Sequence, residues 1–324
     1  MDTTSFTYRY VYGPVPSKRL GSSLGVDLAP LKRCTYDCVY CQLGRTTEKT
    51  VELKPYADPE AVCAELERKL ACGPPPDYIS LAGSGEPTLD AGIGEVIRRI
   101  KGMTTIPVAV LTNGSLLWRE EVRSALLAAD LVLPSLDAGD EALFQYVNRP
   151  HPEISFERMV GGLNDFVRLY RGPVWVEVFL LAGVTALPAE VGKIDAILRR
   201  IGPERIQLNT VTRPPAEEFA LAVPDDQLEG LKGLFSQEAE VVQRRTPSDD
   251  ATAQTAAPSS TGADIVSLLS RRPCTLDDIC SGLCLRPSEA LKHLGALCRA
   301  GAVEVVRRRD GFFYRAVERS IHEP

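Results

Sequence analysis

Cys34-Thr35-Tyr36-Asp37-Cys38-Val39-Tyr40-Cys41 places three thiols within eight residues, with the spacing C-x3-C-x2-C. Thiolates this close can converge on one metal centre, but three of them leave a four-ligand site incomplete. A zinc site would need a fourth Cys or His nearby, and the three histidines of the chain are all distant in sequence. In a [4Fe–4S] cubane, three protein ligands leave one iron open for a second molecule. We therefore expect Cys34, Cys38 and Cys41 to hold a catalytic iron–sulfur cluster rather than a structural zinc ion.

The spacing resembles the signature of the radical S-adenosylmethionine (radical SAM) superfamily. The resemblance implies that SAM chelates the open iron and that the reduced cluster cleaves SAM to a 5′-deoxyadenosyl radical, which abstracts hydrogen from a substrate. It also implies that Tyr40 packs near the adenine, and that an electron donor such as flavodoxin or ferredoxin is a partner. As in other cofactor enzymes, the protein then supplies binding, orientation and shielding.

Composition is that of an ordinary globular protein: the 324 residues are 44% hydrophobic and 25% charged, with a formal net charge of -6. This length predicts one or two domains, and the mild acidity gives no overall electrostatic case for nucleic-acid binding. There is no run of eighteen apolar residues and no basic start followed by an apolar core, so we expect neither a membrane span nor a secretion signal. Nine cysteines, mostly unclustered, favour a reducing cytoplasm over a disulfide framework.

From Leu24 onward, short apolar strands alternate with helices of amphipathic spacing. Strands are expected at 24–28, 78–82, 108–112, 131–136, 174–181 and 205–211, and helices at 59–70, 93–100, 120–129, within 140–170, at 188–201 and at 225–235. Apolar strands of this kind are typical of a parallel sheet covered by helices on both faces. The pattern predicts an α/β fold, a partial (βα)6 TIM-like barrel over residues 1–243, which is also the core fold that the resemblance implies. The Gly- and Pro-rich chain that begins at Tyr12 is expected to be irregular until the first strand.

In such a sheet the site lies at the C-terminal ends of the strands. The second strand ends in Gly83-Ser84-Gly85-Glu86-Pro87, which lacks the third glycine of a dinucleotide loop. The stretch resembles the Gly-Gly-Glu-Pro motif of radical SAM enzymes, and the resemblance implies that Gly83, Ser84, Gly85 and Glu86 hold the amino group of SAM. The alternative is an ordinary glycine turn capped by Glu86.

Polar residues also follow the third and fourth strands. Asn113 begins an Asn-Gly pair, where the resemblance implies a group near the SAM pocket, although this pair is also the commonest turn dipeptide. Ser135 and Asp137 follow the fourth strand, and we expect them to reach the ribose hydroxyls or the carboxylate of SAM. Helix capping is the alternative role for Asp137.

Two stretches resemble a subgroup related to the wyosine-tRNA (tRNA-4-demethylwyosine) synthases: Gly13-Pro14-Val15-Pro16-Ser17 and the sixth-strand stretch 207–217. Asn209 and Arg213 are expected to face the barrel mouth, Asn209 as a cofactor contact. Arg213 is expected to pair a substrate carboxylate or phosphate, or else Glu217 or Glu218. Wyosine synthases carry a second cluster on cysteines upstream of the SAM motif, and this chain has none before Cys34, so we do not transfer their tRNA reaction.

Residues 244–261 are rich in Ala, Thr, Ser and Pro without apolar periodicity, which predicts a flexible linker. Residues 262–324 carry three helical segments and a hairpin expected to turn at Asp310-Gly311, the pattern of a winged-helix domain. Such domains often bind nucleic acid, but ten Lys and Arg against eight Asp and Glu make this one only slightly basic. Docking of a protein or peptide, or packing against the barrel, are the alternatives.

Four further cysteines, Cys274, Cys280, Cys284 and Cys298, lie in this C-terminal region. Cys280 and Cys284 are four residues apart and share a helical face, so a second cluster is one hypothesis. Free cysteines buried in a small helical core are the other.

The leading interpretation is therefore a radical SAM enzyme with a [4Fe–4S] cluster and SAM as cofactors. An RNA base is the first candidate substrate, and a peptide presented by the winged helix is the second. The alternative is a non-enzymatic iron–sulfur sensor that binds DNA through the winged helix.

Overall fold

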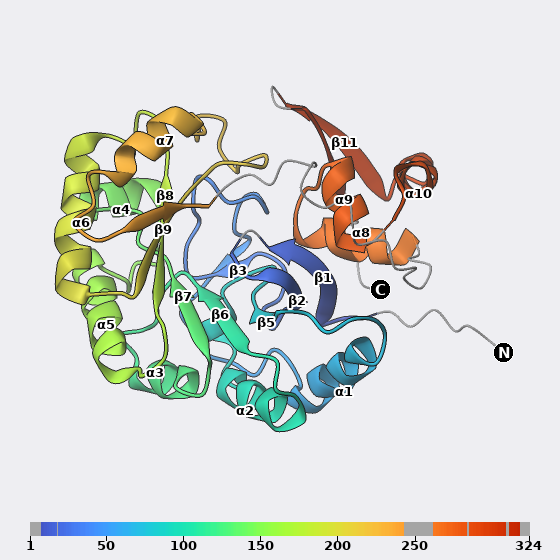
Figure 1. Ribbon diagram of the computed structural model, residues 1–324, viewed down its shortest axis with the longest axis horizontal. Coiled ribbons are helices and arrows are strands. Elements are labelled where there is room, and N and C mark those ends of the chain that lie inside the picture. Colours follow the sequence, from blue (N-terminus) through green and yellow to red (C-terminus); the bar gives the residue numbers. More distant parts are fainter. Residues whose placement is uncertain (1–7, 18, 243–261, 284, 309–310, 318–324) are drawn as a thin grey trace.

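The computed structural model describes residues 8–17, 19–242, 262–283, 285–308 and 311–317. Most of them form an α/β barrel in which helices surround a curved parallel sheet, and those from 262 onward form a smaller unit beside it (Figure 1). None of the helices in these ranges is both long enough and apolar enough to span a bilayer.

The wall of the barrel is a parallel sheet whose strands follow one another in chain order. The strands are β2 (Gly21–Val26), β5 (Tyr78–Leu81), β6 (Val108–Thr112), β7 (Leu131–Pro134), β8 (Trp175–Leu180) and β9 (Arg205–Thr210). Bridges Val132–Val174 and Ser135–Glu177 join β7 to β8, so the two hydrogen-bonded sheets make one curved surface. The predicted alternation of apolar strands with helices is confirmed.

Helices cover the outer face of this sheet (Figure 1). They are α1 (Pro59–Leu70), α2 (Ile93–Met103), α3 (Glu120–Leu126), α4 (Glu141–Val147), α5 (Phe156–Leu169), α6 (Pro188–Ile201) and α7 (Asp225–Lys232), with a 3-10 turn η1 (Pro87–Leu89) after β5. Side-chain caps fix several starts: Asp58 opens α1, Asp140 opens α4 and Ser155 opens α5. Gly202 ends α6 in the left-handed conformation that glycine adopts without strain.

Four further strands lie where no strand was expected from the sequence. β1 (Val11–Ser17) pairs antiparallel with β2, so the expectation of irregular chain there is wrong. β1 is an edge strand with a register shift between Tyr12 and Val15, and such a position tolerates prolines that a central strand would exclude. β10 (Ala239–Val241) extends the sheet beyond β9, and β3 (Arg33–Cys34) pairs with β4 (Glu48–Lys49).

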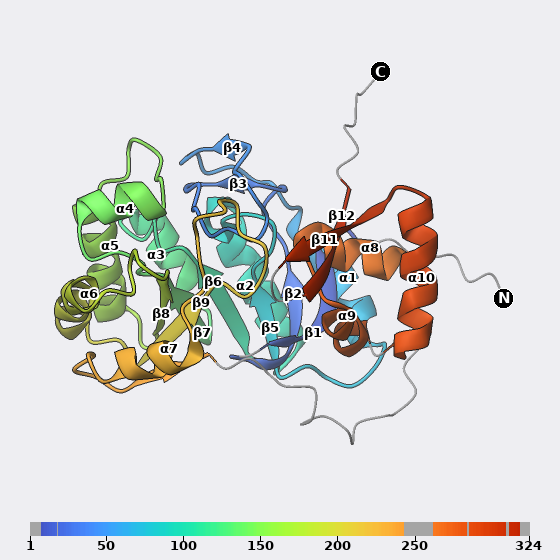
Figure 2. The same cartoon turned by 90° about the horizontal axis from the view of Figure 1, so that it is seen from above.

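The C-terminal unit comprises α8 (Gly262–Arg271), α9 (Leu276–Leu283), α10 (Pro287–Arg299) and the antiparallel strands β11 (Val303–Arg308) and β12 (Gly311–Ala316). Thr275 and Asp278 form a reciprocal capping box at the start of α9. The unit has its own apolar core, which also takes in Val15 of β1. It therefore packs directly on the edge strand of the barrel, as Figure 2 shows from above.

Cys274, Cys280 and Cys298 pack in or against the core of the C-terminal unit. The other thiol of the hypothetical second cluster, Cys284, lies outside the described residues, as do the predicted linker 244–261 and the first residue of the Asp310-Gly311 turn. For the three described thiols, packing accounts for their positions.

Candidate active site

The loop that carries the three predicted ligand cysteines is held against the residues that follow β5 and β6. Thr35 shares a 2.7 Å hydrogen bond with Ser115, and Asn113 Nδ2 donates to Thr35 Oγ1 at 2.8 Å. The same Asn113 amide lies 3.5 Å from Cys34 Sγ. Asn113 thus lies beside the first cysteine, a contact that the sequence did not specify; its expected place near SAM stays a prediction.

A second amide reaches the cysteine loop from the end of α4. Asn148, the C-terminal cap of α4, points Nδ2 at Cys38 Sγ over 3.5 Å. Sequence reasoning missed this residue, because it belongs to no motif and lies 110 positions from its partner. Amide donors to thiolate sulfurs stabilise the anionic ligand and tune cluster potential.

Burial governs the protonation of all three thiols. It raises the pKa of Cys34 to about 12, with the Glu86 carboxylate adding to the effect, and it also raises the pKa of Cys38 and Cys41. In the described chain, no three His, Cys, Asp or Glu side chains could hold a single metal ion. A [4Fe–4S] cluster does not need its ligands to converge on one ion, because each thiolate would bind a different iron atom. The donor set of three thiols and two amide N–H groups fits a cluster whose binding displaces the thiol protons.

The Gly83–Pro87 loop packs so tightly against its surroundings that a side chain at either of two glycines would force a neighbour to move. A Cβ on Gly83 would overlap the carboxyl of Asp27, and one on Gly85 would overlap the carbonyl oxygen of Arg33. Between them, Ser84 donates its backbone N–H and its hydroxyl to Asp27, the hydroxyl at 2.5 Å. The loop is thereby fixed to the end of β2 and to the chain entering the cysteine motif.

Glu86 caps η1, so the capping role considered for it is confirmed. Its buried carboxylate accepts from Thr88 N–H and hydroxyl, from Thr112 Oγ1 at 2.6 Å and from Asn113 N–H at 2.8 Å. Burial raises its pKa, although these donors favour the ionised form. The carboxylate joins the ends of β5 and β6 and holds Asn113 in place.

We expect Gly85→Ala to weaken SAM binding by about tenfold or more, because the clash is with backbone and the loop must move. The measurement is the SAM dissociation constant of the reconstituted protein. Gly161→Ala is the control, since its Cβ would meet open space on an exposed face of α5. Unchanged SAM affinity in the Gly85 variant would show that the loop does not contact SAM.

Tyr40 is the centre of a second group of contacts inside the barrel. Its ring stacks on Phe179 of β8, with centroids 4.0 Å apart and 13° between planes. Its hydroxyl donates to Asp137 Oδ2 at 2.5 Å, and Asp137 also accepts from Asn148 Nδ2 at 2.8 Å and from Phe179 N–H at 3.1 Å. Burial raises the pKa of Asp137 to about 6. The alternative that Asp137 caps a helix is wrong, because Asp140 performs that role for α4.

The remaining predicted residues line the adjoining strands. Asn209 on β9 donates Nδ2 to Glu177 of β8 at 2.7 Å, and Glu177 also pairs with Arg19. The Ser135 N–H bonds to the Thr112 carbonyl at 3.1 Å, which continues the β6–β7 ladder. The Asn209–Glu177 pair on β9 and β8 thus faces the same interior as the stacked rings of Tyr40 and Phe179.

Arg213 lies beyond the end of β9, and it does not pair with Glu217, one of the partners expected for it. Its guanidinium approaches Asp278 of α9 and Gln42 beside the cysteine loop, both at 3.5 Å. Glu217 instead pairs with Arg45 and Arg149 at 2.6 Å, so pairing of Arg213 with Glu217 is wrong.

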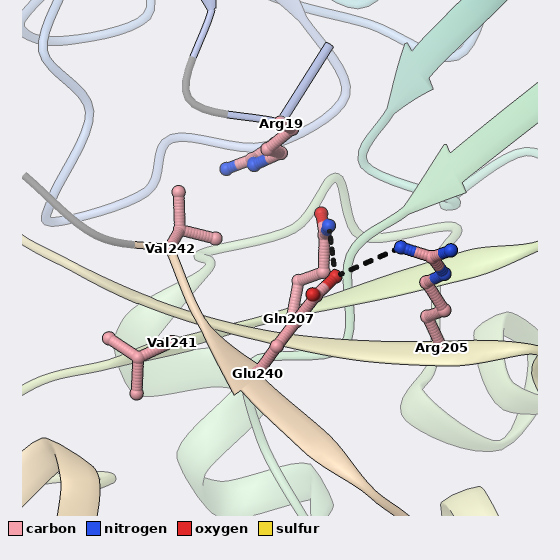
Figure 3. A pocket seen from close by; sticks show the side chains of 6 residues that line it. All are labelled: Arg19, Arg205, Gln207, Glu240, Val241 and Val242. Carbon is pink, nitrogen blue, oxygen red and sulfur yellow. Dashed lines mark hydrogen bonds and ion pairs between the residues drawn. The ribbon is translucent and has the colours of Figure 1, made fainter. Parts of the chain in front are cut away.

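The described residues also enclose cavities near the barrel. One of about 100 Å³ is lined by Arg19, Arg205, Gln207, Glu240, Val241 and Val242 (Figure 3), and none of the predicted site residues lines it. Another, of about 250 Å³, is lined in part by Asp27, Ser84 and Arg271. It lies between the glycine-rich loop and α8 of the C-terminal unit.

Residues 28–218 match the family model described as the radical SAM superfamily, a span that contains the cysteine loop, the glycine-rich loop and the barrel strands after β2. The chain belongs to the radical SAM superfamily. Radical SAM enzymes bind a [4Fe–4S] cluster and SAM, so these are its cofactors, and reductive cleavage of SAM is the chemistry of the family.

A UPF0026 protein of Helicobacter pylori (strain J99) is 32% identical over 94% of this chain and 97% of its own length. A Brachyspira hyodysenteriae protein named GTPase Obg is 41% identical over 90% of this chain, and this chain spans 43% of that protein's length. A radical SAM methyltransferase from Sphaerobacter thermophilus has the same fold at a TM-score of 0.54 and 18% identity, over 68% of this chain and 65% of that one.

Proposed function

We propose that this radical SAM enzyme holds its cluster on Cys34, Cys38 and Cys41. The supporting observation is the position of Asn113: its side chain contacts Cys34 while its backbone N–H bonds to Glu86. One residue therefore ties the cysteine loop to the glycine-rich loop, as a site that binds a cluster and its SAM ligand together requires.

SAM is proposed to lie across the strand ends between these loops. The residues assigned to it are Tyr40, Gly83, Ser84, Gly85, Glu86, Asn113, Ser135, Asp137 and Asn209. Glu86 acts by holding its loop, since protein donors already occupy its carboxylate. Tyr40 and Phe179 offer aromatic surface for the adenine, and Asp137 fixes the Tyr40 hydroxyl.

The substrate we propose is an RNA base, with a peptide as the second candidate, and the electron donor is a flavodoxin or ferredoxin. The wyosine-like stretches support the RNA base. Three helices followed by an antiparallel strand pair in the described C-terminal residues support a winged helix, and their packing on β1 beside the barrel supports a role in presenting substrate.

The test is anaerobic reconstitution, reduction with dithionite and chromatography for 5′-deoxyadenosine, with iron counted on the same sample. We expect 5′-deoxyadenosine and about four iron atoms per chain. About eight would identify the C-terminal cysteines as ligands of a second cluster. A loaded protein that does not cleave SAM would contradict the proposal and favour the non-enzymatic sensor, for which a DNA-binding screen follows.

A further inference from the structure

A buried guanidinium with weak partners lies where the barrel mouth meets the C-terminal unit. Arg213 has a side-chain exposure of 17%, yet its contacts to Asp278 Oδ1 and Gln42 Oε1 are both 3.5 Å long. Both lie at the outer limit of hydrogen-bond distance. Burial, with Arg272 nearby, lowers the pKa of Arg213, so the surroundings do not fully compensate its charge.

Arg272, which directly follows α8, adds a second cation to the same place. Among the described residues, neither Arg213 Nε nor Arg272 Nε has a hydrogen-bond partner, although both atoms are buried. The carboxylate that acts on both arginines is Asp278, and its Oδ2 also accepts the Thr275 N–H of the capping box. Two guanidinium groups thus share one carboxylate, and buried donors without partners are costly.

We infer that Arg213 and Arg272 bind a phosphate group of the substrate. A phosphate presents oxygens in three dimensions and can accept from two guanidinium edges at once, whereas a planar carboxylate matches a single fork. Binding would supply the missing negative charge and give both Nε groups an acceptor. The inference extends the proposed function, since a phosphate belongs to the RNA candidate rather than to the peptide.

The location gives the C-terminal unit a part in substrate recognition. Gln42 directly follows Cys41, so an anion at Arg213 lies beside the cysteine loop. Arg213 comes from the barrel, while Arg272 and Asp278 come from the C-terminal unit, so the site exists only when the two are packed together. This accounts for a small domain fixed to the edge strand rather than hanging free.

The test is equilibrium binding of inorganic phosphate to the full-length cluster-loaded protein by calorimetry, with acetate as the comparison anion. We expect phosphate to bind the wild type, and Arg213→Gln and Arg272→Gln each to weaken it by about tenfold or more, as loss of charge-assisted hydrogen bonds predicts. Arg205→Gln is the control, because Arg205 is exposed and contacts Glu240 instead.

Arg213→Lys keeps the positive charge that pairs with Asp278 but removes the Nε donor. We expect this variant to fold and to bind phosphate more weakly than the wild type does. Equal phosphate affinity in wild type and the Arg213 and Arg272 variants would overturn the inference, and so would acetate binding as tightly as phosphate. 5′-Deoxyadenosine formation is measured separately. If the protein cleaves SAM but does not bind phosphate, the phosphate site is wrong and the proposed function stands. If it binds phosphate but does not cleave SAM, the proposed function is wrong.

Discussion

Cys38→Ala is expected to abolish cluster binding and reduce 5′-deoxyadenosine formation to background. Two thiolates cannot hold a cubane whose fourth iron must stay open to SAM, and no described residue near Cys38 offers a replacement sulfur besides Cys34 and Cys41. The fold should survive, because Cys38 packs only at the margin of the barrel core. Iron content, the visible cluster spectrum and circular dichroism of the same sample are the measurements.

Cys63→Ala is the matched control, since Cys63 is a buried thiol of α1 outside the loop. It should keep a full cluster and lose only the modest stability of a small cavity. If the Cys38 variant retained a full iron complement while the C-terminal cysteines were intact, the ligand assignment would be wrong.

Local patterns in the sequence were sufficient for the barrel and for the cysteine motif. Apolar strand runs and caps such as Pro at the start of α1 and α6 depend on neighbours along the chain, and their elements lie where expected. The three cysteines could be proposed as cluster ligands because their spacing constrains the metal chemistry, and the structure holds them together in one loop. Asn113 was proposed from its place in a turn motif after a strand, and it lies directly after β6.

What the sequence could not supply are contacts between distant segments. Asn148 reaches Cys38, and Asp278 reaches Arg213, only because the fold brings α4 and α9 to the barrel mouth. Glu86 was predicted beside SAM, but its carboxylate is used to join two strand ends. β1 was missed because its prolines oppose a strand everywhere except at an edge.

The packing of the C-terminal unit on the barrel also rests on such distant contacts. Arg271, the last residue of α8, lies 3.4 Å from the Asp27 carboxylate, stacks over the Tyr12 ring at 4.7 Å and donates to the Arg9 carbonyl at 2.9 Å. Asp27 in turn holds Ser84, and Tyr12 donates its hydroxyl to the Ala82 carbonyl at 3.0 Å. The Asp27 contact thus reaches the Gly83–Pro87 loop that we assign to SAM, and the Tyr12 contact reaches the residue just before that loop.

Arg271→Gln is therefore expected to lower the free energy of unfolding by about 3 kcal/mol, the usual cost of leaving a buried charge without its partner. The Arg271–Asp27 pair is buried, with side-chain exposures of 10% and 8%. SAM affinity should fall about tenfold as well. Without Arg271, Asp27 loses its ion-pair partner and holds Ser84 of the Gly83–Pro87 loop less firmly. Denaturant unfolding and SAM binding are the two measurements.

Arg315→Gln is the control for removing an arginine from the same unit. Its pair with Glu304 is about half exposed, so the loss should be at most about 1 kcal/mol with SAM binding unchanged. Adding Asp27→Asn to Arg271→Gln should recover part of the stability, since asparagine can still accept from Ser84 without leaving a charge uncompensated. If Arg271→Gln lowered stability but left SAM affinity intact, the C-terminal unit would brace the barrel without acting on the SAM loop.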